Sequence, residues 1–188
     1  IYDDHSADLV GTWSCLTESY AEVLIINADG TAVSYGVEDG EYWENVKGTV
    51  VTEGGNITMN FEDDDNLTGH FDIIPGQSFS LYEDSGERYI YQYCANDLSD
   101  EIIGMWVWVD PSGNGSENMG IQTFNENGTA LFTGGYEEID YKVNEGTTYK
   151  VVGDLLMQNV PNDNPPYMVR RLTYNANGAS YGAVLTTY

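Results

Sequence analysis

Short runs of alternating apolar and polar residues follow one another along the chain and stop at Gly, Asn or Asp. Such alternation is typical of strands with one buried face, and Asp-Gly and Asn-Gly steps accept the positive φ of tight hairpins. The first half is predicted to hold strands at residues 10–18, 21–28, 31–37, 42–52, 56–62, 67–74, 78–83 and 87–94. The second half is predicted to hold strands at residues 104–110, 117–125, 129–136, 139–144, 147–153, 155–160, 167–174 and 179–187. No window shows a helical stripe, so we expect an all-β protein.

Two motifs occur twice in the chain. Residues 9–13 read apolar, apolar, Gly, any residue, Trp, and residues 102–106 repeat this order. Likewise, the stretch Asn-Ala-Asp-Gly-Thr-Ala in the first half is matched by Asn-Glu-Asn-Gly-Thr-Ala in the second. Such self-similarity indicates tandem units. We therefore predict a flexible leader at residues 1–8 and two units, at residues 9–95 and 102–188.

Each unit is predicted to close into an antiparallel meander barrel of about eight short strands. Closure removes the exposed strand edges that an open sheet of this kind would carry. The predicted fold class is therefore all-β, with two tandem barrels joined by a short polar linker.

The Gly-x-Trp motif at the start of an eight-strand meander resembles the lipocalin superfamily. Its tandem occurrence resembles the lipocalin-like domains of lipoproteins secreted by Bacteroidetes. The resemblance implies that Gly11 with Trp13, and Gly104 with Trp106, plug one end of each barrel. It also implies an Arg late in the last strand that packs over the Trp, whereas Arg88 lies at the start of that strand here.

The same resemblance, together with a first residue other than Met, implies an exported protein. We expect it at the periplasm or surface of a bacterial cell, as a lipoprotein with an N-terminal lipid anchor. This anchor would be its one contact with a membrane.

The charge is strongly negative, with 31 acidic and 6 basic residues and a formal net charge of −25. Such a surface repels phosphate backbones and anionic headgroups, which disfavours charge-driven binding of nucleic acid or membranes. It leaves two interpretations open, general solubility or a face that binds cations or a cationic partner.

Cys15 and Cys94 are the only cysteines, and they lie in the first and last predicted strands of the first unit. These strands are neighbours in a closed meander. A disulfide between them would close a loop of roughly eighty residues and stabilise the fold by about 4–5 kcal/mol. The alternative is a pair of buried free thiols, and the sequence leaves both open.

Residues suited to catalysis or to binding a metal are few. His5 and His70 are isolated, which gives no Ser-His-Asp, Cys-His or zinc arrangement. Asp110, Ser112 and Asn114 have the alternate spacing of a calcium loop, but the twelfth position is apolar, so a hairpin loop is the simpler interpretation. We expect neither an enzyme nor a cofactor.

Aromatic residues are the remaining candidates for binding. Tyr89, Tyr91 and Tyr93 share one face of a predicted strand, and Trp108 shares a face with Trp106. Pointing outward, they would stack on sugars or grip a protein, and pointing inward they would fill the barrel.

The expected function is non-catalytic binding by a monomer. The ligand would be a small apolar molecule in a barrel or a partner at the groove between the barrels. The alternative is a structural or interaction module with filled barrels, which could bind carbohydrate through exposed aromatics. The sequence does not distinguish a small molecule, a glycan and a protein as the partner.

Overall fold

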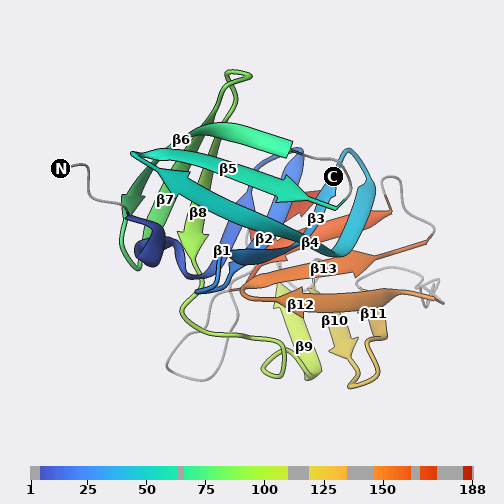
Figure 1. Cartoon of the computed structure of the whole chain (residues 1–188). Helices are drawn as coiled ribbons and strands as arrows, with labels where there is room; N and C mark the ends of the chain where they lie inside the picture. The colour runs from blue at the N-terminus through green and yellow to red at the C-terminus, as the bar shows by residue number, and fades with distance from the viewer. Residues whose placement is uncertain are drawn as a thin grey trace.

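The computed structural model describes residues 5–62, 66–109, 119–134, 146–161, 166–172 and 184–187. Its first half holds the 3-10 helix η1 (His5–Leu9) and the strands β1 (Gly11–Leu16), β2 (Tyr20–Ile26), β3 (Thr31–Glu38), β4 (Glu41–Glu53), β5 (Asn56–Phe61), β6 (Asn66–Ile74), β7 (Ser78–Glu83) and β8 (Arg88–Tyr93). These strands form a closed antiparallel barrel in sequence order (Figure 1). Closure comes from the pairing of Trp13 on β1 with Tyr93 on β8. The eight-strand meander barrel predicted for the first unit is confirmed.

The second half contains β9 (Gly104–Val109), β10 (Met119–Phe124), β11 (Ala130–Gly134), β12 (Thr148–Val152), β13 (Leu155–Asn159), β14 (Tyr167–Arg171) and β15 (Val184–Thr187). They form two open sheets, one of order β11-β10-β9 and one of order β12-β13-β14-β15. A single bridge between Thr129 and Thr148 links the sheets. The all-β prediction is confirmed, but a second closed barrel is not shown by the described residues. The strand predicted at residues 139–144 lies outside them.

The two Gly-x-Trp motifs have the same local structure. The indole Nε1 of Trp13 donates to the backbone oxygen of Leu9 at 2.7 Å, and that of Trp106 donates to the oxygen of Ile102 at 2.6 Å. Each Trp is therefore fixed by the residue four positions before it.

The two repeated turns also share their hydrogen bonds. Asp29 Oδ1 accepts the backbone N–H of Thr31 at 3.0 Å, and Asn127 Oδ1 accepts that of Thr129 at 3.1 Å. Asx turns of this kind set the chain reversal locally. The sequence repeat is thus also a structural repeat.

One end of the barrel is closed by helix η1 and Trp13. Trp13 is fully buried, and Leu9, the last residue of η1, is 1% exposed. The Tyr93 ring packs edge-on against Trp13 with centroids 5.1 Å apart, and it covers Gly11, where a Cβ would meet it at 2.6 Å. Tyr93 therefore lies beside Trp13, whereas Arg88 lies five residues earlier, at the start of β8. The last part of the predicted leader is ordered as η1.

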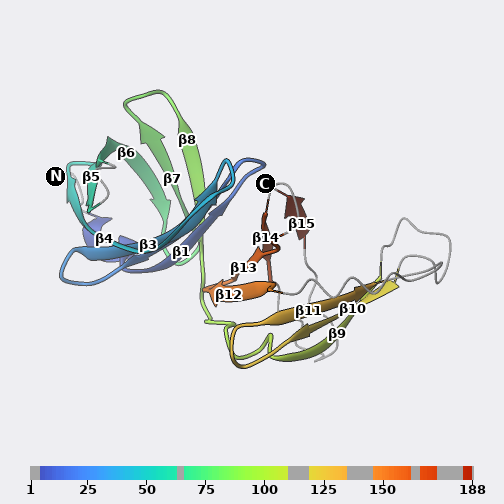
Figure 2. The ribbon, with the colours of Figure 1, turned by 90° about the vertical axis from the view of Figure 1, so that its right-hand side faces the viewer.

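The two halves pack through an apolar interface (Figure 2). It joins the outer face of β2 and β3 to the sheet β12-β13-β14, and its fully or nearly fully buried members are Ala21, Val23, Val37, Val152, Leu155, Met157 and Val169. Alternate residues of β2 face the barrel interior, so this strand is buried on both faces. We call this contact the docking interface.

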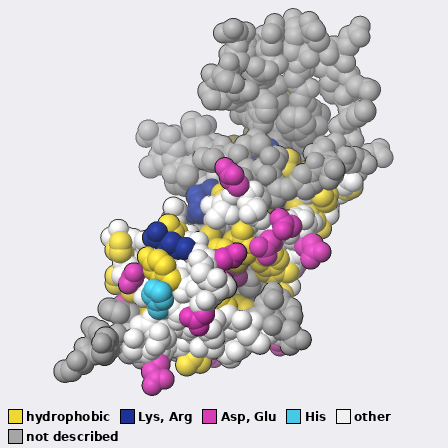
Figure 3. Space-filling view, turned by 90° about the horizontal axis from the view of Figure 1, so that it is seen from above, with side chains coloured by type: hydrophobic (Ala, Val, Ile, Leu, Met, Phe, Trp, Pro, Cys, Tyr) yellow, Lys and Arg dark blue, Asp and Glu magenta, His cyan; other side chains and the backbone are white. Residues whose placement is uncertain are grey.

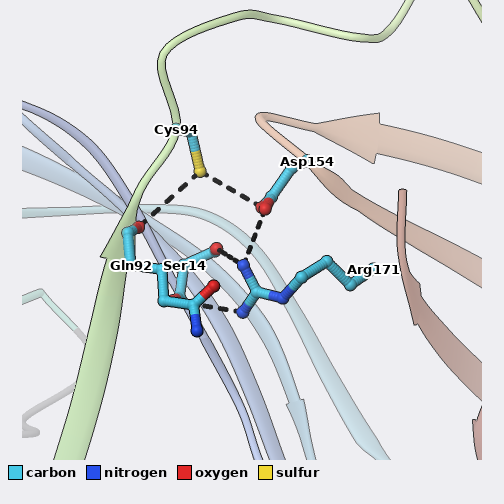
Figure 4. A network of polar contacts seen from close by, with 5 residues as sticks. All are labelled: Ser14, Gln92, Cys94, Asp154 and Arg171. Carbon is cyan, nitrogen blue, oxygen red and sulfur yellow. Dashed lines mark hydrogen bonds and ion pairs between the residues drawn. The ribbon is translucent and has the colours of Figure 1, made fainter. Parts of the chain in front are cut away.

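A polar network borders the docking interface (Figure 4). Arg171 Nη1 on β14 pairs with Asp154 Oδ2 at 2.6 Å and donates to Ser14 Oγ on β1 at 2.7 Å. The Cys94 thiol donates to Asp154 Oδ1 at 3.1 Å. The barrel wall is therefore tied directly to the turn between β12 and β13.

Both cysteines are buried free thiols, the second of the two alternatives. The pairing of β1 with β8 places Cys94 opposite Thr12 and Cys15 opposite Tyr91, so the cysteines are about 10 Å apart along the strands. They also face opposite sides of the wall, since Cys15 belongs to the barrel core and Cys94 contacts the second half. This separation keeps the two sulfur atoms too far apart to form a disulfide.

We predict that both thiols are unreactive in the folded protein. Burial is the main cause that raises the pKa of each from 9.0 to about 12. At pH 8, labelling with dithionitrobenzoate should be about 1000-fold slower in the native protein than in urea, because the thiolate is the reactive form. Rapid native labelling would contradict the buried placement.

The same pKa shifts predict a pH dependence of stability. Above pH 9 the thiols of the unfolded chain ionise while those of the folded chain stay protonated. The free energy of unfolding should therefore fall as the pH rises from about 9 to about 12.

Candidate functional site

The barrel is hollow at the end opposite Trp13. A cavity of about 920 Å³ opens there between the turns that join β3 to β4 and β7 to β8. Its lining has three levels, which are a buried polar floor, an aromatic and apolar wall, and an acidic rim.

Glu22 is the centre of the floor. It lies on β2 at an inward-facing position and is 6% exposed. Its Oε2 accepts from the hydroxyl of Tyr20 at 2.7 Å and from that of Tyr91, and its Oε1 accepts from Ser34 Oγ at 2.6 Å. Trp43 Nε1 in turn donates to Ser34 Oγ at 2.8 Å. One carboxylate thus organises residues from β2, β3, β4 and β8.

These bonds leave the floor rich in acceptors and poor in donors. The hydroxyl groups of Tyr20, Ser34 and Tyr91 all donate their protons to Glu22. Each hydroxyl oxygen can therefore act toward a ligand only as an acceptor. Burial, followed by the nearby charge of Glu22, raises the pKa of Tyr20 and Tyr91 well above the ordinary value, which keeps both phenols protonated. No basic side chain among the described residues forms an ion pair with Glu22. The floor therefore favours a positively charged donor.

The wall above Glu22 presents aromatic faces. The Tyr20 ring lies 6.1 Å from Trp43 and 4.9 Å from Tyr89, centroid to centroid, with both pairs tilted. Aromatic faces of this kind attract cations. The rest of the lining includes the apolar Val46, Met59, Phe61 and Leu67 and the polar Asn66 and Thr68.

A β-bulge aims Trp43 into the cavity. The pairing of β3 with β4 shifts between Ser34 and Gly36, so that two residues of β4 stand opposite Tyr35. One of them, Asn45, has a φ of 57°. The bulge turns the strand so that Trp43 lies over Gly36, which has no side chain to obstruct it.

Replacement of Gly36 by Ala should displace Trp43. The added Cβ would stand 2.1 Å from Trp43 Cζ2 and 2.5 Å from the backbone oxygen of Ala21, which cannot move freely. We expect a loss of about 2 kcal/mol in the free energy of unfolding. Near-UV circular dichroism should report the loss of the Trp43–Ser34 hydrogen bond.

Gly54→Ala is the matched control, because a Cβ at that position meets nothing within 4 Å. It introduces strain at a positive φ but should leave the near-UV spectrum unchanged. An unchanged spectrum in Gly36→Ala as well would contradict the assigned role of Gly36.

The rim of the cavity is acidic. The turn between β3 and β4 and the turn between β7 and β8 provide six of its carboxylates, namely Glu38, Asp39, Glu41, Glu83, Asp84 and Glu87. Acidic side chains also outnumber basic ones on the face seen in Figure 3. A cleft lined by one sign of charge concentrates counterions and raises their association rate. The rim therefore attracts cations toward the floor.

The aromatic residues predicted as candidates have different positions. Tyr89 and Tyr91 point inward and line the cavity, while Tyr93 packs beside Trp13. The side chain of Trp108 lies outside the described residues.

The calcium candidates Asp110, Ser112 and Asn114 also lie outside the described residues. Within the described ranges, no group of three or more His, Cys, Asp or Glu side chains could hold a metal ion. His70 is exposed and stacks on Tyr82, with ring centroids 4.7 Å apart.

Glu22 and Trp43 were not among the site residues predicted from the sequence. A signal for Glu22 exists, since it interrupts an inward-facing series of Tyr20, Leu24 and Ile26 on a predicted strand. A charged residue at such a position is a functional candidate because its burial is costly.

The buried polar residues of the second half differ from those at the floor of the first barrel. Arg170 is 7% exposed, and its Nη1 donates to Gln122 Oε1 at 3.4 Å. Burial lowers the pKa of Arg170. Counting from the repeated turns, Gly120 corresponds to Glu22, so the second half has no carboxylate at the equivalent position.

Fold and site together define an eight-stranded antiparallel meander barrel, plugged by Trp13 and open at the other end onto an acidic, aromatic cavity. In comparisons with known proteins, no family model matches the chain, and no curated protein or solved structure gives a significant match. The described part of the chain contains no helix of the length and apolarity needed to cross a membrane. The cavity of the first barrel is therefore the candidate functional site.

Proposed function

We propose that the protein is a non-catalytic binding protein that takes a small organic cation, bearing an ammonium group, into the first barrel. The observation that carries the proposal is the buried Glu22 carboxylate, which faces the cavity and has no described basic partner. This proposal refines the expectation of an apolar ligand, because the wall is aromatic and apolar while the floor and rim are anionic.

The contacts at the floor suit an ammonium group. Removing a cation from water is costly unless anionic and hydrogen-bonding groups replace its hydration. Glu22 offers the charge, the phenol oxygens of Tyr20 and Tyr91 offer lone pairs, and Trp43 offers an aromatic face. An anionic ligand would meet only acceptors there.

The composition of the lining supports the non-catalytic part of the proposal. The described residues that line the cavity include no His, Lys, Arg or Cys. Its buried hydroxyls are committed as donors to Glu22, which holds them in place. Such fixed groups suit recognition better than proton transfer.

The test compares binding of tyramine by the wild-type protein and by Glu22→Gln, measured by calorimetry. Gln keeps the size and one acceptor but removes the charge, so the affinity for tyramine should fall at least about tenfold. Glu53→Gln is the matched control, because Glu53 is exposed at the end of β4 away from the cavity mouth, and its affinity should equal that of the wild type. Equal affinity in Glu22→Gln would refute the proposal.

We further propose that the second half is a second lipocalin-like unit of an exported lipoprotein. The repeated Trp anchors and Asx turns support this assignment. The alternative of a filled structural module applies best to this half, since its described interior residues Leu98, Ile102, Phe124, Ala130, Val151, Leu156 and Leu172 pack into one cluster.

A further inference from the structure

We infer that the ligand of the first barrel carries two positive charges at the ends of an apolar chain, as a linear diamine or polyamine does. This inference rests on the proposed function and specifies the class of cation. It follows from the separation of two anionic levels, at the floor and at the mouth, in a cavity whose other lining is largely aromatic and apolar.

The floor and the rim are both anionic, but the wall between them is not. Glu22 supplies the charge at the floor, and the two acidic turns supply the charge at the mouth. On β8, Tyr89 lies between Glu87 and the Tyr91 that binds Glu22, and the lining also includes Val46, Met59, Phe61 and Leu67. A ligand with one charged end would leave either the floor or the rim without a counter-charge, whereas methylene groups between two ammonium groups match the wall.

The strand pairing gives the separation of the two anionic levels. Glu22 pairs with Gly36, and Glu38 lies two residues further along β3, which is about 7 Å. On β8, Glu87 lies four residues before Tyr91, the residue that binds Glu22, which is about 13 Å. A ligand whose two ammonium groups are joined by four to eight methylene groups matches this range of distances. Examples are 1,4-diaminobutane and 1,8-diaminooctane.

The contact of one ammonium group with Glu22 and the contact of the other with the rim should differ in strength. Glu22 is buried and acts in a low-dielectric environment, whereas the rim carboxylates are exposed to solvent and salt. The floor therefore provides most of the affinity for any amine, and the rim provides the preference for a second charge. We expect that preference to be about tenfold at low ionic strength and smaller at high salt.

The experiment compares 1,8-diaminooctane with nonylamine by calorimetry on the full chain. The two molecules have the same length, and nonylamine carries a methyl group where the diamine carries its second ammonium. We expect the diamine to bind the wild-type protein about tenfold more tightly. The double variant Glu38→Gln with Glu87→Gln removes the two rim carboxylates that define this separation, and it should reduce the preference for the diamine at least about threefold.

Two further variants complete the design. Glu22→Gln should weaken both ligands, because it removes the contact that they share. Glu53→Gln combined with Glu126→Gln removes the same number of charges as the rim variant at positions away from the mouth, and it should keep the preference for the diamine.

The outcomes separate the inference from the proposed function. If nonylamine binds the wild-type protein as tightly as the diamine, or if the rim variant keeps the preference, the two-charge inference is overturned while cation binding stands. If neither amine binds, the proposed function fails as well.

Discussion

Replacement of Trp13 by Ala is expected to lower the free energy of unfolding by about 3–5 kcal/mol. Trp13 is fully buried and packs edge-on against Phe79 and Tyr93 at centroid distances of 5.0 and 5.1 Å. Its indole also fixes Leu9, and with it helix η1, through one hydrogen bond. The substitution leaves a large cavity at the closed end and an unpaired backbone oxygen, so both losses add.

Urea unfolding followed by far-UV circular dichroism measures this loss. Trp43→Ala is the matched control, since Trp43 is half-buried at the open cavity and its removal exposes space that water can enter. The control should cost less stability than Trp13→Ala but should weaken amine binding. Equal stability losses would contradict the assignment of Trp13 as the plug and Trp43 as a wall residue.

Replacement of Val37 by Asp should cost about 4 kcal/mol and uncouple the two halves of the chain. Val37 is fully buried in the docking interface, on the outer face of β3. Its neighbours in the sheet pairing are Ala21 and Tyr42, which offer no positive charge. A carboxylate there must remain unpaired, become protonated or separate the interface.

Limited proteolysis together with urea unfolding tests this prediction. In Val37→Asp, cleavage should begin in the second half, while the barrel remains resistant. Val51→Asp is the matched control, because Val51 is 59% exposed on β4 and the same change should cost less than about 0.5 kcal/mol. Similar costs for the two variants would show that the docking interface contributes little.

The first barrel could be predicted closely from the sequence, because its determinants are local. Alternation placed all eight strands, and Gly-containing turns such as those at Gly30 and Gly86 placed their ends. Turn residues act over a few positions, so their effect does not depend on distant contacts.

The determinants of the site are not local, which is why sequence analysis did not find them. Trp43 enters the cavity because a bulge shifts the pairing of β3 and β4, and Gly36 leaves room for its ring. Glu22 meets Tyr91 across 69 sequence positions. Neither relation has a signature in a single strand.

The relation between the two cysteines and the closure of the second half also depend on contacts between distant residues, so the sequence did not predict them. Adjacent strands suggested that Cys15 and Cys94 could pair, but the register and the side of the wall separate them. The repeat predicted a second barrel, whereas the described residues form two sheets joined by one bridge. Sequence patterns predict strands more reliably than the closure of a sheet, since closure depends on pairing between distant strands.

The most direct test of the account is the charge preference of the wild-type barrel. Calorimetry should compare tyramine with 4-propylphenol, which has the same shape but carries a methyl group in place of the ammonium. The account predicts that tyramine binds at least about tenfold more tightly and that added salt narrows the difference. If 4-propylphenol binds as tightly as tyramine, the cavity selects for apolar shape, and the role assigned to Glu22 and the acidic rim is wrong.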